Sequence, residues 1–130
     1  MSELNVTASA HFHEDGQHVV HVLLKVMVSN ENGAGRKDLA LADFKVQAMD
    51  SVANLVNVDV TAVSGEVELG KSLSDVPRGF YLLNVYTSDG VSFDVNVPWT
   101  VIIHVDRWRY LFHYEGWAVV AVNSRSTLTY

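Results

Sequence analysis

Four histidines lie close together near the N-terminus: His11, His13, His18 and His21. Alternating apolar residues on both sides of a Glu-Asp-Gly turn predict a β-hairpin there, whose register puts His11, His13 and His21 on one polar face. Imidazole nitrogens on neighbouring strands are ligands that zinc and nickel accept. No carboxylate completes such a site, because the nearby acidic residues fall in the turn. The pattern therefore favours solvent-exposed histidines, with a metal site at these three positions as the alternative.

The densest group of aromatic residues lies between residues 107 and 117. As a single strand this segment has one wholly aromatic face, with Trp108, Tyr110, Phe112 and Tyr114 in alternation and Trp117 following a predicted turn at Glu115-Gly116. The favoured interpretation is a stripe of core residues that closes the fold. The alternative is a partly exposed surface that stacks on sugar rings or anchors a protein partner, since Tyr and Trp combine a large apolar face with one polar group. Arg107 and Arg109 would flank that surface and contact acidic groups of the partner.

Residues 65–72 read Gly-Glu-Val-Glu-Leu-Gly-Lys-Ser and match the phosphate-loop pattern G-x-x-x-x-G-K-S. A working loop of this type lies between a strand and a long helix, whose N-terminus and backbone N–H groups bind the phosphates. Pro77 follows too soon to leave room for that helix, and Glu66 and Glu68 would repel the phosphates. We therefore expect no nucleotide site, and we expect an edge strand at residues 66–69.

Composition narrows the functional classes further. The 130 residues are 48% hydrophobic and 18% charged, which is typical of one packed domain spanning residues 1–130. A net charge of −6 without a basic cluster argues against nucleic-acid binding, and the absence of cysteine excludes disulfides and thiolate chemistry. No hydrolase or metalloprotease motif is present, which predicts a protein without enzymatic activity or cofactor.

No segment has the pattern of a signal peptide or a membrane span. The longest apolar run, Val19 to Val28, is interrupted by His21 and Lys25. This predicts a cytoplasmic protein without a membrane partner, and it leaves export by a signal-independent route open.

The apolar pattern predicts strands along most of the chain. Two hairpins are expected to have three-residue loops that end in glycine: Glu14-Asp15-Gly16 would pair Ala10 with Val20, and Ser88-Asp89-Gly90 would pair Val85 with Phe93. Further strands are predicted at residues 44–49, 55–63, 99–105 and 117–122. About eight or nine short strands in this length are typical of an all-β, antiparallel sandwich.

Residues 38–55 allow two interpretations. A strand places Phe44 and Ala48 inside and Lys45 outside. A helix capped by Asp38 would also group the apolar residues on one stripe, but it would place Lys45 within that stripe. The strand is favoured, and the helix, which would make the fold α+β, is the alternative.

Three segments resemble bacterial immunoglobulin-like modules. They are residues 26–33 with an Asn-Gly turn, residues 41–46 with an Asp-Phe strand entry, and residues 77–83 with the pattern Gly79-x-Tyr81-x-Leu83. The last segment is also similar to a tyrosine corner, with Leu83 where many such domains have cysteine and Pro77 where the pattern has Asp. The resemblance covers roughly residues 18–105. It implies an immunoglobulin-like sandwich that binds, spaces or assembles and does not catalyse.

The resemblance and the aromatic segment together predict a non-catalytic protein-interaction or assembly module. Its partner would be another protein or further copies of the chain, bound through the aromatic C-terminal hairpin or an exposed sheet edge. A carbohydrate-binding module that uses the same aromatic residues is the alternative.

Overall fold

Strands dominate the computed structural model, which describes residues 2–14, 19–36, 39–62 and 79–123. In chain order they are β1 (Ser2–Glu3), β2 (Asn5–Glu14), β3 (Val20–Ser29), β4 (Phe44–Met49), β5 (Leu55–Val56), β6 (Val58–Ala62), β7 (Phe80–Thr87), β8 (Thr100–Arg109) and β9 (Phe112–Asn123). One 3-10 turn, η1 (Leu41–Asp43), precedes β4, and the described residues contain no α-helix. The fold is all-β, as predicted.

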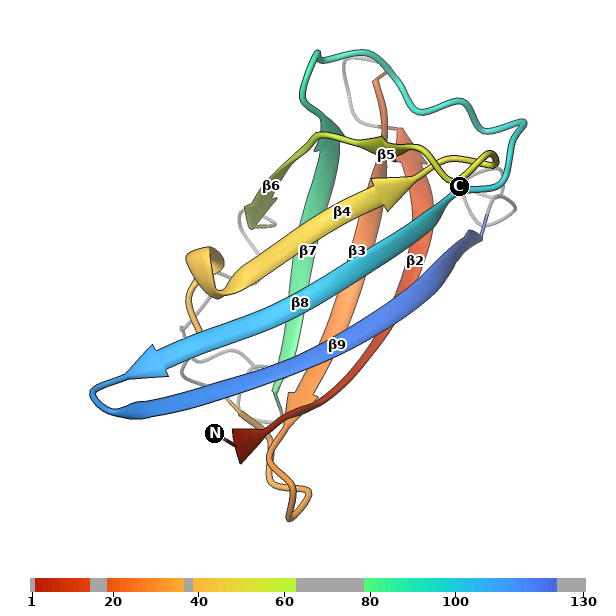
Figure 1. Ribbon diagram of the computed structural model, residues 1–130. Coiled ribbons are helices and arrows are strands. Elements are labelled where there is room, and N and C mark those ends of the chain that lie inside the picture. The colour runs from red at the N-terminus through yellow and green to blue at the C-terminus, as the bar shows by residue number, and fades with distance from the viewer. Residues whose placement is uncertain (1, 15–18, 37–38, 63–78, 124–130) are drawn as a thin grey trace.

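The strands form one mixed sheet in the order β5-β4-β8-β9-β2-β3-β7-β6, with β1 added beside β9. The sheet curls until it is nearly closed into a barrel, and in Figure 1 the layer of β4, β8 and β9 crosses in front of β2, β3 and β7. Most neighbouring strands are antiparallel, but β9 runs parallel to β1 and β2. The expectation of a purely antiparallel sheet is therefore wrong. Within the described residues, no helix is both long and apolar enough to cross a membrane.

The core lies between the two layers and is filled by alternate residues of the long strands. The fully buried side chains of β3, β7 and β8 are Val22, Leu24, Val26, Val28, Tyr81, Leu83, Val85, Val101, Ile103 and Val105. Because successive side chains of a strand point to opposite faces, this alternation leaves the other face of each strand for polar and functional residues. Burying each of these apolar side chains contributes about 1.5–3 kcal/mol.

Residues 44–49 form β4, so the helix considered for residues 38–55 is wrong in this region. Phe44 and Ala48 are buried, while Lys45 points to solvent and pairs with Asp106. A helix would have placed the Lys45 side chain within the apolar stripe, where its charge would lose hydration. Asp38, the proposed helix cap, lies outside the described residues.

The first hairpin has the predicted faces but a different register. The partners are Ala10 with Leu24 and Glu14 with Val20, which leaves residues 15–19 between the strands. The predicted pairing of Ala10 with Val20 is therefore wrong by four positions. Both registers put the apolar faces together, because they differ by an even number of residues, so the apolar pattern alone could not choose between them.

The second predicted hairpin is wrong, although its turn is present. The amide of Gly90 donates to the carbonyl of Thr87, but residues 91–98 form no strand. Both edges of β7 are already occupied, by β3 and by β6. The chain instead passes the start of β3, where the amide of Phe93 donates to the carbonyl of Val20 at 3.1 Å, before it reaches β8. Phe93 is buried, and its ring lies 5.0 Å from that of Trp99.

Tyr81 bonds through its side chain to a distant segment of the chain, and the upstream residues of the tyrosine-corner pattern, 75–78, lie outside the described residues. Its hydroxyl donates to the carbonyl of Arg36 at 2.6 Å and accepts from the amide of Leu39 at 3.3 Å. A tyrosine corner bonds to backbone a few residues upstream, whereas this hydroxyl reaches a segment more than forty residues away. Tyr81 therefore joins β7 to the segment that leads into β4.

The remaining strand predictions are confirmed with changed limits. The predicted strand 55–63 is divided into β5 and β6, and the strands predicted at 99–105 and 117–122 are parts of the longer β8 and β9. The phosphate-loop match at 65–72, the edge strand at 66–69, Pro77 and His18 lie outside the described residues.

Candidate functional site at the β8–β9 hairpin

The aromatic segment forms the end of a long hairpin instead of a single strand. Arg109 pairs with Phe112, so Tyr110 and Leu111 alone form the loop. The hairpin extends past the other strands of the barrel (Figure 1). Its large apolar side chains are strongly exposed: Trp108 by 63%, Tyr110 by 89%, Leu111 by 94%, Phe112 by 64% and Trp117 by 58%. The expectation that this stripe closes the core is wrong.

The sequence interpretation was wrong because it placed the turn at Glu115-Gly116 instead of at Tyr110 and Leu111. Gly116 is not in a turn but in the middle of β9, opposite Val105. A side chain there would collide with the carbonyl oxygen of Leu4, so the close approach of that backbone requires glycine. The true turn divides the predicted stripe: Trp108 and Trp117 lie on the outer face of the hairpin, and Phe112 and Tyr114 lie on the inner face with Arg107 and Arg109.

Tyr110 has a backbone conformation that is uncommon for a bulky residue. Its φ is 56°, in the left-handed region where glycine and asparagine are favoured. Two-residue hairpin loops normally have glycine, asparagine or aspartate at such positions. A strained backbone that carries an almost fully exposed aromatic side chain is unfavourable for folding.

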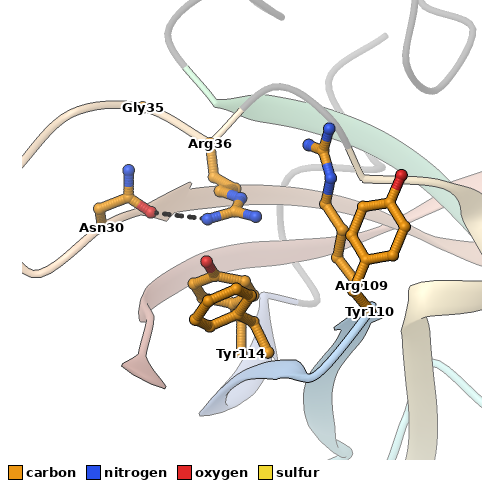
Figure 2. A pocket seen from close by; sticks show the side chains of 7 residues that line it. Asn30, Gly35, Arg36, Arg109, Tyr110 and Tyr114 are labelled. Carbon is orange, nitrogen blue, oxygen red and sulfur yellow. Dashed lines mark hydrogen bonds between the residues drawn. The ribbon is translucent and has the colours of Figure 1, made fainter. Parts of the chain in front are cut away.

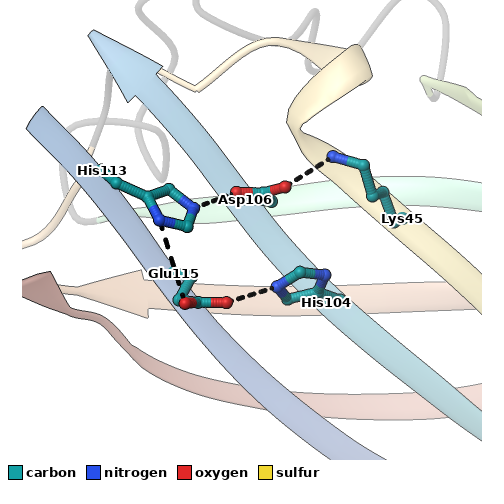
Figure 3. A network of polar contacts seen from close by, with 5 residues as sticks. All are labelled: Lys45, His104, Asp106, His113 and Glu115. Atoms are coloured by element: carbon teal, nitrogen blue, oxygen red, sulfur yellow. Dashed lines mark hydrogen bonds and ion pairs between the residues drawn. The ribbon is translucent and has the colours of Figure 1, made fainter. Parts of the chain in front are cut away.

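The outer face carries a row of polar contacts between its two tryptophans (Figure 3). Asp106 accepts from Lys45 at 3.0 Å and also bonds to Nε2 of His113. Glu115 bonds to Nε2 of His104 at 2.9 Å, and its other oxygen lies 3.9 Å from Nδ1 of His113. The two carboxylates therefore connect both imidazoles and one ammonium group in a continuous network.

Each imidazole of this network also stacks on a tryptophan across the strand pair. The ring centroids are 3.8 Å apart for His104 and Trp117, and 4.1 Å apart for Trp108 and His113, with both pairs nearly parallel. An imidazole held on one side by a carboxylate and on the other by an indole has few conformations left. The network therefore fixes the two exposed tryptophans and lowers the entropy that they would lose on binding.

Hydrogen bonds from His113 and then from Lys45 hold the pKa of Asp106 below its ordinary value. A lowered carboxyl pKa stabilises the folded state above the pKa of the unfolded chain, and this contribution disappears as the pH falls through the folded pKa. We expect Asp106→Asn to lower the free energy of unfolding by less than about 1 kcal/mol at neutral pH, because the pairs lie at the surface. As the pH falls below the ordinary aspartate pKa of about 3.9, the difference in unfolding temperature between the two proteins should shrink. Thermal unfolding followed by circular dichroism checks this, and an undiminished difference in acid contradicts it.

The inner face borders an open groove with a volume of about 530 Å³. Figure 2 shows the groove between the hairpin and the loop that follows β3, with the guanidinium of Arg36 over the ring of Tyr114. Arg36 lies 4.0 Å from that ring centroid and donates to the side chain of Asn30 at 3.2 Å. Arg109, Tyr110 and Phe112 complete the hairpin wall. Arg107 lies deeper and donates to Asp43 at 3.0 Å.

The histidines of the first hairpin, His11, His13 and His21, share one face as predicted, but that face is not fully solvated. His13 lies opposite His21, but His21 is only 3% exposed, stacks on Tyr86 and bonds to Asn84 at 2.9 Å. His11 is half-buried, and desolvation, with a smaller contribution from His13, lowers its pKa. In the part of the chain that the structure describes, no group of three or more His, Asp or Glu side chains is arranged to hold a metal ion.

Comparisons with models of known protein families, with curated proteins and with solved structures find no match to this chain. Its function is therefore argued from the geometry of the hairpin.

Proposed function

We propose that this protein is a non-catalytic, immunoglobulin-like module that binds another protein through the tip of the β8–β9 hairpin. The observation that carries the proposal is the exposure of Trp108, Tyr110, Leu111 and Phe112 at a hairpin end that extends past the barrel. Isolated apolar side chains are normal on a surface, but a contiguous group of this size marks an interaction site. Tyrosine and tryptophan are also enriched among the residues that dominate binding energy at protein interfaces.

The strand order supports the immunoglobulin-like assignment. The sequence of neighbours β2-β3-β7-β6 follows the order A-B-E-D of immunoglobulin domains, and β4-β8-β9 follows C-F-G. In this assignment the hairpin tip is the F–G loop and residues 30–36 belong to the B–C connection. Those two loops lie together at the end of the domain that binds ligands in variable immunoglobulin domains, so the placement of the hairpin agrees with the proposed role by analogy.

The hairpin is a better candidate than the sheet edges. The ends of the strand order are β5, which has two residues, and β6, which has five. Edge strands this short offer few backbone groups to an incoming strand. The imidazoles of the outer face are held by carboxylates and indoles, and that network holds the aromatic side chains in position instead of presenting a nucleophile. We therefore propose a binding surface without catalysis or cofactor.

A substitution at the strained Tyr110 can separate an effect on partner binding from an effect on the free energy of unfolding. We expect Tyr110→Asn to raise the free energy of unfolding by roughly 0.5–1 kcal/mol, because asparagine tolerates the left-handed conformation. The same change should weaken partner binding about tenfold, because it removes an exposed aromatic contact. Ala53→Asn is the matched control: Ala53 also has positive φ, at 66°, but lies in the β4–β5 loop away from the hairpin tip.

The measurements are thermal unfolding and quantitative affinity capture of partners, with light scattering to detect self-association. The proposal predicts that both asparagine variants gain stability while only Tyr110→Asn loses the captured partner or the oligomer. A monomer whose captured proteins are the same for all three chains would refute the role of the hairpin.

Carbohydrate binding is the second candidate, and one observation favours it. Trp108 and Trp117 expose their rings on the same outer face, with carboxylate and imidazole groups between them that suit sugar hydroxyls. A glycan array with the wild type and with Trp117→Ala separates the two candidates. Glycan binding that depends on Trp117 and not on Tyr110 would favour carbohydrate over protein.

A further inference from the structure

We infer that the inner groove of the hairpin binds an acidic segment of the protein partner, in which carboxylates alternate with apolar side chains. The inference rests on the proposed protein-binding function and adds the chemistry of the partner. It starts from an uneven distribution of charge: the chain has a net charge of −6, yet all three arginines in its described part, Arg36, Arg107 and Arg109, lie around this groove or beneath it.

The arginines differ in what they offer a ligand. Arg107 donates to Asp43, and this pair joins the hairpin near its tip to the turn before β4. Arg36 and Arg109 line the groove itself, one from each side. A guanidinium has five N–H donors in a planar fork, so it can keep its existing contacts within the protein and still donate to a carboxylate. The two groove arginines therefore favour an anionic ligand.

The aromatic residues of the groove favour a ligand that has apolar side chains as well as negative charge. Arg36 is held over the ring of Tyr114, which fixes the plane of its guanidinium. Phe112, the cross-strand partner of Arg109, and Tyr110 form an apolar wall of the groove. A simple inorganic anion would leave that wall in contact with water. A segment with apolar side chains next to its carboxylates covers the wall and satisfies the arginines together.

Neighbouring acidic residues limit where the segment lies. Glu3 and Glu31 line an adjoining hollow on the far side of Arg36, and Asn30 borders both spaces. Like charges would repel a carboxylate there, so the acidic segment is confined to the groove itself, between Arg36 and Arg109. The overall negative charge does not prevent this local contact, because charges beyond about 8 Å are largely screened at physiological salt.

Fluorescence anisotropy with two labelled peptides tests the inference. One alternates glutamate with phenylalanine, and the other replaces glutamate by glutamine. We expect the wild type to bind the acidic peptide at least about tenfold more tightly than the neutral one, and Arg109→Glu to lose this preference. Lys25→Glu changes the net charge equally at a site where Lys25 lies over Phe80, away from the groove, and should retain it.

The outcomes separate this inference from the proposed function. Equal affinity of the wild type for both peptides, or an effect of Lys25→Glu as large as that of Arg109→Glu, overturns the acidic-segment assignment. Tighter binding of heparin than of the acidic peptide overturns the assignment to a protein segment. Loss of partner capture by Tyr110→Asn without any loss by Arg109→Glu rejects the groove and leaves the hairpin tip as the binding site.

Discussion

Replacing Gly79 by alanine is expected to lower the free energy of unfolding by about 4 kcal/mol. Gly79 has φ of 84°, a conformation that costs an L-residue about 1–2 kcal/mol. The new methyl group would also collide with the carbonyl oxygen of Val28 and lie 3.0 Å from the amide nitrogen of Arg36. That carbonyl accepts the Arg36 amide, and the Val28 amide donates to Gly79 at 2.8 Å, so relief of the collision would break backbone hydrogen bonds.

Gly90→Ala is the matched control for this prediction. Gly90 has a similar φ of 80°, but among the described residues, apart from its two chain neighbours, no atom lies within 4 Å of the position that a methyl group would take. It should cost only about 1 kcal/mol, from backbone strain alone. Denaturant unfolding of the three proteins measures both values, and equal losses for the two alanine variants would refute the argument from the collision.

Side-chain alternation was the most reliable sequence signal in this chain. It identified which residues of β3, β4 and β7 face the core, because a face is fixed once the strand is recognised. It could not fix the register of β2 on β3, since a shift by four residues preserves every face. Nor could it show that β7 already has neighbours on both edges, because that depends on the strand order of the whole sheet.

The segment of the β8–β9 hairpin was recognised as unusual in the sequence, but its geometry was not predicted. The segment was interpreted as one strand with its turn at the only nearby glycine, Gly116. The structure instead places a strained tyrosine in the turn and the glycine in a strand, which reverses the ordinary residue preferences at both positions. Local propensity fails at these positions because tertiary contact requires Gly116, and because Tyr110 takes up a left-handed backbone conformation at a cost to folding.

The network on the outer face was not predicted either, because the turn was placed at the wrong residues. His104 and Trp117 are thirteen residues apart and become neighbours only when the turn lies at Tyr110 and Leu111. That register also pairs Asp106 with Glu115 and Trp108 with His113. The sequence contains the outer-face residues as two alternating runs of polar and aromatic residues, at positions 104–108 and 113–117. Pairing these runs with each other requires a hairpin loop that contains no glycine.

Both faces of the hairpin therefore contribute to the proposed interaction in different ways. On the outer face, carboxylates hold imidazoles that in turn hold the exposed tryptophans, so the surface is ordered before a partner arrives. On the inner face, Arg36 and Arg107 connect the hairpin to the rest of the domain through Tyr114 and Asp43. The segment that carries Arg36 is itself held by Tyr81, so the groove depends on a residue in the core.

Replacing Tyr81 by phenylalanine is accordingly expected to cost about 2 kcal/mol in the free energy of unfolding, because the buried backbone groups of Arg36 and Leu39 lose their hydrogen bonds to its hydroxyl. It should also weaken binding of the acidic peptide, since the hydroxyl donates to the Arg36 carbonyl at 2.6 Å and thereby positions the groove wall. Tyr110→Phe removes a hydroxyl that is exposed to solvent and should change stability by less than about 0.5 kcal/mol. Chemical denaturation and peptide anisotropy measure the two effects. A Tyr81→Phe protein as stable as the wild type would show that the hydroxyl does not hold this segment to the core.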